Sequence, residues 1–128
     1  MAKILFSDVL AGNVAIVTGG TRSVGKGIVK ALARAGATVY LTGSSTPDET
    51  ARRITDETGN GNLFGIQLDH SDDAATAELF TRIQQEQDGR LDILVNNAIA
   101  GARYVLTDDY DANARFFERP IEMWDSVH

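Results

Sequence analysis

The chain has 128 residues, a formal net charge of −6 and no cysteine, and 43% of its residues are hydrophobic. This size suits one domain with one core over residues 1–128. The lack of cysteine excludes disulfides and thiolate chemistry. An acidic balance without a basic patch argues against a nucleic-acid partner. No apolar run approaches membrane length, so we expect a cytoplasmic protein without a membrane segment.

The chain begins its regular pattern with a short apolar run at residues 14–18, which predicts a buried strand ending in a glycine-rich turn. Residues 24–35 place their apolar side chains at helical spacing, which predicts a helix. Gly36 follows directly and is typical of a helix C-terminus. The expected apolar face of this helix consists of Val24, Ile28, Leu32 and Ala35.

A second strand and helix are predicted next. Residues 38–42 form a short apolar run that ends in turn residues, as expected of a strand. The following helix is expected to have Thr46 as its N-cap, Pro47 in its first turn and Glu49 completing a capping box. It ends near Gly59.

The rest of the chain repeats the alternation. Residues 63–68 and 91–95 read as strands, and a loop from residue 98 to about 115 leads to a last helix near Pro120. The helix between the two strands is expected to be capped within Ser71-Asp72-Asp73 and to end at Gly89. Four strands alternating with helices predict an α/β fold, a three-layer Rossmann-like parallel sheet with strand order 3-2-1-4.

The glycine-rich turn after the first strand is the strongest candidate site. Gly19 can adopt backbone angles that a Cβ forbids, and Gly25 lets the helix and strand pack closely. The unpaired N–H groups of the first helical turn would then point at a ligand. The helix dipole favours an anion such as a pyrophosphate at this position. An ordinary strand-to-helix turn without a ligand is the alternative.

A nucleoside triphosphate site is a second alternative for the same residues. Residues 20–26 match Gly-x-x-x-x-Gly-Lys, the start of a P-loop. A P-loop needs Ser or Thr next, to hold magnesium, and this chain has Gly27 there. The pattern therefore favours a dinucleotide over a nucleoside triphosphate.

Two motifs carry a resemblance to a known family. The run Thr18-Gly19-Gly20-Thr21-Arg22-Ser23-Val24-Gly25 resembles the Thr-Gly-x-x-x-Gly-x-Gly fingerprint of short-chain dehydrogenases/reductases, and Asn96-Asn97-Ala98 is similar to their Asn-Asn-Ala-Gly motif. Ser23 replaces the middle glycine, and Ile99 replaces the last one. If the backbone at Ser23 needs a positive φ, serine costs about 1 kcal/mol there. Residues 96–101 and 117–125 together resemble one branch of this family.

The resemblance implies an NAD(P)-dependent oxidoreductase acting on a carbonyl or alcohol, of which this chain is the cofactor-binding half. Asp69 would contact the adenine, although a carboxylate there can also cap the next helix. The amides after the fourth strand can bind backbone groups of neighbouring strands. The implied cofactor-binding residues are Thr18, Gly19, Thr21, Arg22, Ser23, Val24, Gly25, Ser44, Asp69, His70, Asn96 and Ala98.

The end of the second strand bears on the choice of dinucleotide. NAD enzymes place an acidic residue there, whereas this chain has Thr42-Gly43-Ser44-Ser45. The lack of a carboxylate, with Arg22 in the phosphate turn, favours NADP(H) over NAD(H). Against this, many relatives have an arginine where this chain has Ser44. Arg22 as a solvated loop charge is the alternative.

Family catalysis uses a serine and a Tyr-x-x-x-Lys pair. Four residues after Tyr40, Tyr104 and Tyr110 stand serine, aspartate and alanine, so this pair is missing. We therefore assign no catalytic residue and no metal site, and we expect the chain alone to be inactive. A non-catalytic dinucleotide-binding module and an inactive remnant are the alternatives. Residues 91–95 would form an open sheet edge, which predicts self-association.

Overall fold

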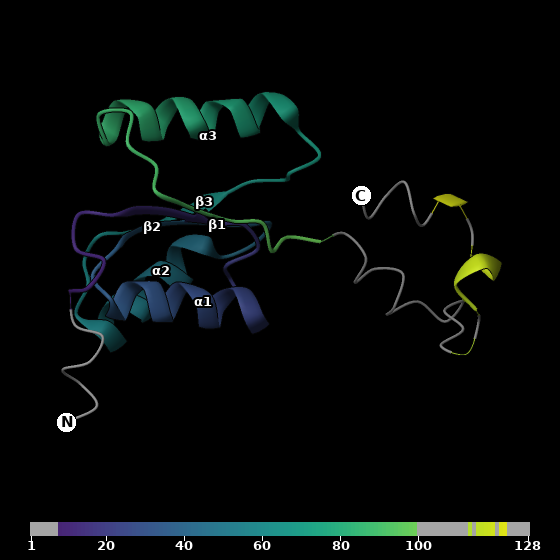
Figure 1. Ribbon diagram of the computed structural model, residues 1–128, viewed down its shortest axis with the longest axis horizontal. Helices are drawn as coiled ribbons and strands as arrows, with labels where there is room; N and C mark the ends of the chain where they lie inside the picture. Colours follow the sequence, from purple (N-terminus) through teal and green to yellow (C-terminus); the bar gives the residue numbers. More distant parts are fainter. Residues whose placement is uncertain (1–7, 100–112, 114, 120, 123–128) are drawn as a thin grey trace. The chain divides into compact units, whose positions relative to one another are not determined.

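The computed structural model describes residues 8–99, 113, 115–119 and 121–122. The chain divides into two compact units, Met1–Ala98 and Ile99–His128. In the first unit, one sheet lies between two layers of helices, with α1 (Ser23–Arg34) and α2 (Pro47–Thr58) on one face and α3 (Asp73–Glu86) on the other (Figure 1). This confirms the predicted three-layer architecture, whereas a single domain over residues 1–128 stays a prediction.

Four parallel strands form the sheet in the order β3-β2-β1-β4, which confirms the predicted order. In the register, Val14 of β1 pairs with Thr38 of β2, and Ala15 pairs with Ile93 of β4. All four strands end at the same edge of the sheet because they are parallel, and that edge gathers the segments that follow them. Their bounds are β1 (Val14–Val17), β2 (Thr38–Gly43), β3 (Leu63–Gln67) and β4 (Ile93–Val95).

Strand β4 begins two residues later than predicted, because the Asp92 side chain takes part in the pairing. The Asp92 N–H donates to the Val14 carbonyl at 2.9 Å, and the Asp92 carboxylate accepts from the Val14 N–H at 2.8 Å. The Arg90 guanidinium, 2.8 Å away, and this backbone N–H hold the pKa of Asp92 below its usual range. Both interactions fix the entry into β4.

Most of the apolar face predicted for helix α1 is confirmed, since Ala35 is buried and Ile28 and Leu32 pack against the core. Gly25, Val29 and Ala33 are buried, spaced four residues apart, whereas Val24 is 68% exposed. The prediction that Val24 lies on the apolar face is therefore wrong. Gly25, next to Val24, packs against the strand-end backbone at Gly19 instead. Gly36 ends the helix with a φ of 88°, as predicted.

The start of α2 also differs from the prediction. Thr46 precedes the helix with a φ of 53°, and its side chain makes no capping hydrogen bond. Thr46 is the N-cap residue and Pro47 lies in the first turn, as predicted, but the expected capping box is wrong, because Glu49 pairs with Arg53 at 2.6 Å instead. At α3 the prediction holds, because the Asp72 side chain accepts a hydrogen bond from the Ala75 N–H at 3.0 Å.

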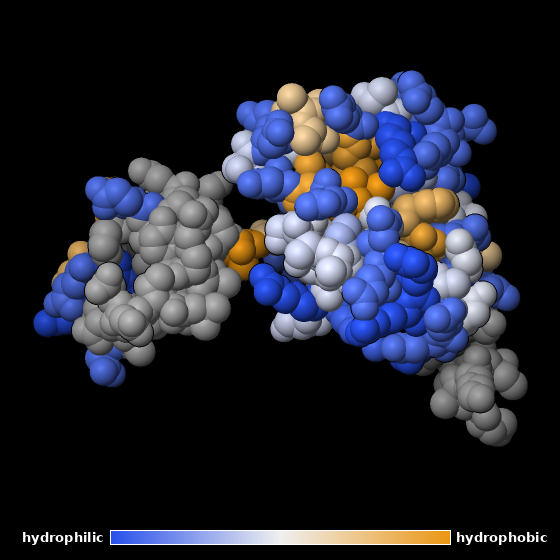
Figure 2. All heavy atoms as spheres, turned by 180° about the vertical axis from the view of Figure 1, so that it is seen from behind, coloured by the Kyte–Doolittle hydropathy of each residue, from blue (hydrophilic) through white to orange (hydrophobic). Residues whose placement is uncertain are grey.

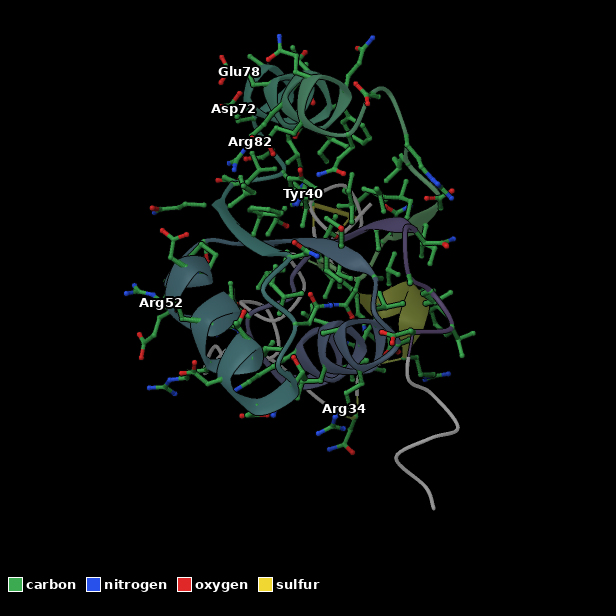
Figure 3. The ribbon with its side chains drawn as sticks, turned by 90° about the vertical axis from the view of Figure 1, so that its left-hand side faces the viewer. Arg34, Tyr40, Arg52, Asp72, Glu78 and Arg82 are labelled. Atoms are coloured by element: carbon green, nitrogen blue, oxygen red, sulfur yellow. The ribbon has the colours of Figure 1, made fainter. Side chains whose placement is uncertain are left out.

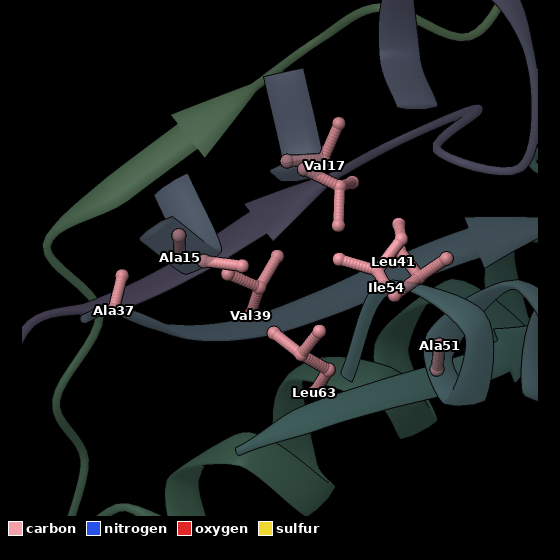
Figure 4. Packing of buried hydrophobic residues seen from close by; sticks show 10 residues of the cluster. Ala15, Val17, Ala37, Val39, Leu41, Ala51, Ile54 and Leu63 are labelled. Atoms are coloured by element: carbon pink, nitrogen blue, oxygen red, sulfur yellow. The ribbon is translucent and has the colours of Figure 1, made fainter. Parts of the chain in front are cut away.

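Buried apolar residues form one cluster on each face of the sheet. The cluster under α1 and α2 contains Val17, Leu41 and Ile54, all essentially unexposed (Figure 4). The cluster under α3 packs Leu79 and Ile83 against the opposite side of the strands. Since both faces of the strands are buried, the sheet is built from nearly continuous apolar runs rather than alternating ones.

Tyr40 of β2 anchors α3 to the sheet. Its ring is fully buried and stacks on Phe64 at 5.0 Å, and its hydroxyl donates to a Glu86 carboxylate oxygen at 2.6 Å. Arg82 of α3 points toward the ring and pairs with Glu86 at 2.8 Å (Figure 3). Burial and the Glu86 hydrogen bond raise the pKa of Tyr40, and the same bond lowers the pKa of Glu86.

In the second unit, the described residues include one turn of 3-10 helix, η2 (Phe116–Glu118). The Arg115 N–H donates to a Glu118 carboxylate oxygen at 2.9 Å. The centre of the predicted last helix, Pro120, lies outside the described residues. No helix in the part of the chain that the structure describes is long and apolar enough to cross a membrane.

Candidate functional site

The glycine-rich turn joins β1 to α1 with very little space between backbone atoms. Gly19 has a φ of 65°, a conformation that favours glycine. A Cβ added at Gly25 would collide with the Gly19 carbonyl and would lie 2.5 Å from the Asn97 side-chain amide nitrogen. Both glycines are therefore required by the turn, as predicted.

The N-terminus of α1 presents unpaired backbone donors. Arg22 occupies the N-cap position with extended backbone, and its side chain makes no capping hydrogen bond. Its carbonyl accepts the Lys26 N–H at 3.2 Å, so the preceding first-turn N–H groups have no intrahelical partner. Such donors, together with the helix dipole, suit a phosphate group. The turn before α1, which a Cβ at Gly25 would disrupt, therefore fits the pyrophosphate of a dinucleotide.

Ser23 holds a backbone conformation that serine rarely adopts. Its φ is 52°, and the residue is exposed at the first position of α1. The serine that replaces a glycine of the fingerprint therefore stands where the backbone has a positive φ. The strain of a Cβ in this region is about 1 kcal/mol.

We expect Ser23→Gly to raise the free energy of unfolding by about 1 kcal/mol, since glycine removes that strain. Denaturant unfolding of the variant and the parent chain measures the difference. Thr46, in the loop before α2, has a similar φ of 53°. Thr46→Gly is therefore the matched comparison and should also raise the free energy of unfolding. A lower stability of Ser23→Gly would show that the hydroxyl contributes more than the strain costs.

Hydrogen bonds join the segments that follow β1 and β4. The Thr18 hydroxyl accepts the N–H groups of Asn97 and Ala98 at 2.9 and 2.8 Å and lies 3.3 Å from the Val95 carbonyl. The Asn97 side-chain amide donates to the carbonyls of Thr18 and Gly19, both at 3.1 Å. The expectation that an amide after this strand binds neighbouring backbone is confirmed.

Of the two adjacent asparagines, the second makes these contacts. Asn97 is half-buried and Asn96 is exposed, since successive side chains point to opposite sides. Asn97 is a site residue that the sequence prediction left out, although the strand alternation would have identified it. Ala98 contributes its backbone N–H, which donates to the Thr18 hydroxyl.

The same turn contacts the end of β2. The Gly20 N–H donates to the Thr42 carbonyl at 2.9 Å, and a Cβ at Gly43 would collide with the Thr21 side chain. Thr21 therefore lies directly over Gly43. Ser44 follows, exposed, and its carbonyl accepts the Gln67 side-chain amide at 3.2 Å.

The turn after β3 holds the last two predicted residues. The Asp69 carboxylate accepts the N–H and the hydroxyl of Ser71 at 2.9 and 2.7 Å, so it shapes this turn, while Asp72 caps α3. His70 is half-buried, and its Nε2 lies 2.8 Å from the Thr42 hydroxyl. That hydroxyl also accepts the Gly19 N–H at 3.3 Å.

The structure thus gathers the twelve predicted residues at the carboxyl ends of the four strands. Hydrogen bonds or close packing join Thr18, Gly19, Gly25 and Ala98 directly. Thr42, which the sequence prediction omitted, links His70 to the same turn. The exposed residues among the twelve are Arg22, Ser23, Val24, Ser44, Asp69, Asn96 and Ala98.

A cleft of about 710 Å³ lies elsewhere, along β3. Arg52 of α2, Phe64 and Arg82 of α3 contribute to its lining, and Figure 3 shows the two arginines on helices that cover opposite faces of the sheet. Seen from behind, apolar atoms are visible between the α3 layer and the rest of the first unit (Figure 2). None of the twelve predicted residues lines the cleft. Among the described residues, no group of three metal-binding side chains occurs.

Three comparisons place this architecture among known proteins. Human dehydrogenase/reductase SDR family member 1 is 40% identical over 119 residues, which are 91% of this chain and 36% of that protein. RhlG of Pseudomonas aeruginosa, solved as an active-site complex with NADP, matches with a TM-score of 0.68 and 33% identity, over 95% of this chain and 42% of that one. A short chain dehydrogenase from Mycobacterium smegmatis matches with a TM-score of 0.72 and 25% identity, over 94% of this chain and 46% of that one.

These matches extend over most of this chain but over less than half of each relative. The chain spans little more than a third of the length of the human protein and of its mouse counterpart. The model of the short chain dehydrogenase family matches residues 13–123, which include the glycine-rich turn and the Asn-Asn-Ala run. The chain therefore belongs to the short-chain dehydrogenase/reductase family.

Proposed function

We propose that the carboxyl edge of the sheet binds a nicotinamide dinucleotide, as part of an oxidoreductase that acts on a carbonyl or alcohol. The observation that carries this proposal is the turn in which Gly25 packs on the Gly19 carbonyl and leaves the first amides of α1 unpaired. The bound dinucleotide would supply or accept a hydride. The twelve residues named from the sequence would form the site, by contact with the dinucleotide or by shaping the turns that contact it, and Asn97 would support them.

The same proposal favours NADP(H) over NAD(H). The contact of Thr21 with Gly43 puts the glycine-rich turn against the end of β2, so Arg22 follows at that junction. The exposed serines there, Ser44 and Ser45, carry no charge that would repel a 2′-phosphate. RhlG, a relative of similar fold, was solved with NADP.

We expect Arg22→Ala to weaken NADPH binding about tenfold and to change NADH binding less than twofold, because a charge-assisted contact to the 2′-phosphate is lost. Titration of nicotinamide fluorescence measures both affinities. Arg34→Ala, at the other end of α1, removes the same charge and should change neither affinity. An equal loss of both cofactors in Arg22→Ala would remove Arg22 from the 2′-phosphate.

Catalysis by the chain alone is not part of this proposal. Tyr40 is buried and hydrogen-bonded to Glu86 and Gln87, while Tyr104 and Tyr110 lie outside the described residues. Inactivity of the isolated chain stays a prediction, and NADPH oxidation above the buffer rate with a panel of carbonyl compounds would contradict it. A cytoplasmic location and the lack of a nucleic-acid partner also stay predictions.

Self-association through β4 is a second proposal. Among the described strands, β4 pairs with β1 alone, and Leu94 is 48% exposed. Backbone groups on the outer side of such a strand can pair with another chain. Light scattering on the purified chain tests this, and a monomer at high concentration would contradict it.

A further inference from the structure

Thr42 receives the two successive amides that form the glycine-rich turn. Its carbonyl accepts the Gly20 N–H at 2.9 Å, and its hydroxyl accepts the Gly19 N–H at 3.3 Å. The residue is completely buried at the end of β2. Gly19 is also the residue with a φ of 65° whose carbonyl packs on Gly25. The Thr42 hydroxyl therefore acts on the orientation of the peptide plane that shapes the turn.

The hydroxyl is in turn fixed by His70, whose Nε2 lies 2.8 Å away. A threonine hydroxyl has one proton to donate and two lone pairs. With one lone pair taken by the Gly19 N–H, the hydroxyl can either donate a hydrogen bond to Nε2 or accept one from an Nε2–H group. Either tautomer of the imidazole therefore completes the hydrogen bonds that connect Gly19, Thr42 and His70. The Thr42 rotamer is fixed by the Gly19 N–H and by the His70 ring.

The His70 ring is itself attached to a constrained turn. The preceding residue, Asp69, accepts the N–H and the hydroxyl of Ser71 through its carboxylate and the Asp72 N–H at 3.0 Å through its carbonyl. Asp72 then caps α3. This sequence of bonds links the start of α3 to the turn between β1 and α1, although the two segments are about 50 residues apart in the chain.

We propose that Thr42 and His70 are a pair of positioning residues for dinucleotide binding. His70 fixes the Thr42 hydroxyl, and the hydroxyl holds the Gly19 amide so that the turn keeps the geometry required by a pyrophosphate. This inference rests on the proposed function. Since the pair acts on the phosphate turn and not on the 2′-phosphate, it affects NADPH and NADH equally, in contrast to Arg22.

Cofactor titration of matched variants tests the pair. Thr42→Val keeps the shape of the side chain but removes the acceptor of the half-buried Gly19 N–H, and His70→Leu removes the ring nitrogen. We expect each to weaken NADPH and NADH binding by the same factor, about tenfold. Thr42→Ser and His70→Gln each keep a polar atom at the bonded position and should stay within about threefold of the parent chain.

The double variant Thr42→Val/His70→Leu shows whether the two residues act through one bond. We expect it to bind no more weakly than Thr42→Val alone, because both substitutions break the same chain. Losses that add would assign the two residues separate roles and overturn the proposal. An affinity of Thr42→Val within twofold of the parent chain would overturn it as well.

A second readout needs no cofactor. Hydrogen exchange at the Gly19 amide, followed by NMR, is expected to be at least tenfold faster in Thr42→Val and in His70→Leu than in the parent chain, and unchanged in Thr42→Ser. Equal exchange in all of them would overturn the proposal. If the parent chain binds neither dinucleotide, the proposed function fails while the exchange rates still decide the role of the pair.

Discussion

Replacing Gly25 with alanine is expected to abolish dinucleotide binding and to lower the free energy of unfolding by about 3 kcal/mol. The added Cβ would collide with the Gly19 carbonyl, which is backbone and has no rotamer to change. Relief requires α1 to move away from β1, and this movement disrupts the phosphate turn. Chemical denaturation and titration with NADPH measure the two effects.

The matched control lies two residues further along the same helix. A Cβ at Gly27 would meet no neighbouring atom within 4 Å, so Gly27→Ala adds the same methyl group to exposed helix surface. That variant should be more stable than the parent chain by about 1 kcal/mol, because alanine favours a helix. Equal stabilities of the two variants would show that the close approach at Gly25 is not required.

Thr18→Val is expected to lower the free energy of unfolding by about 3 kcal/mol, the second large effect. The valine keeps the shape but loses the oxygen that accepts the N–H groups of Asn97 and Ala98, and both donors are left unpaired. Thermal and denaturant unfolding measure the change. Dinucleotide binding should weaken in parallel, because Asn97, which Thr18 helps to position, also donates a hydrogen bond to the Gly19 carbonyl.

Thr18→Ser is the control, since it keeps the hydroxyl and loses only a methyl group. Its stability should lie within about 1 kcal/mol of the parent chain. A serine variant as unstable as the valine variant would assign the effect to packing of the methyl group rather than to the hydrogen bonds.

The sequence predicted the parts of the fold that depend on local pattern. Short apolar runs alternating with helical segments identified the strands, and their order followed because parallel strands joined by right-handed crossovers leave few topologies. The roles of Gly19 and Gly25 were predictable for a similar reason, since a sharp strand-to-helix turn needs a positive φ and a close approach. The cap at Asp72 followed from the residue type and its position before an amphipathic segment.

Features that depend on contacts between distant segments were not predictable in this way. The bond between Thr42 and His70 joins residues 28 positions apart, and no periodicity marks it. Helix spacing alone placed Val24 on the apolar face, but it is Gly25 that packs on the strand-end backbone, and Val24 is exposed. Thr46 occupies the N-cap position as predicted, yet its backbone is left-handed and its side chain makes no capping hydrogen bond.

The most direct test of the dinucleotide site is NADPH titration of the 15N-labelled chain, followed by amide chemical shifts. The account predicts saturable shifts at Gly19, Ser23 and Val24, at the carboxyl edge of the sheet, with weaker effects of NADH at equal concentration. The amides of Gly59 and Gly61, before β3 at the opposite edge, should not move. No saturable shift in the glycine-rich turn, or shifts confined to the cleft along β3, would contradict the account.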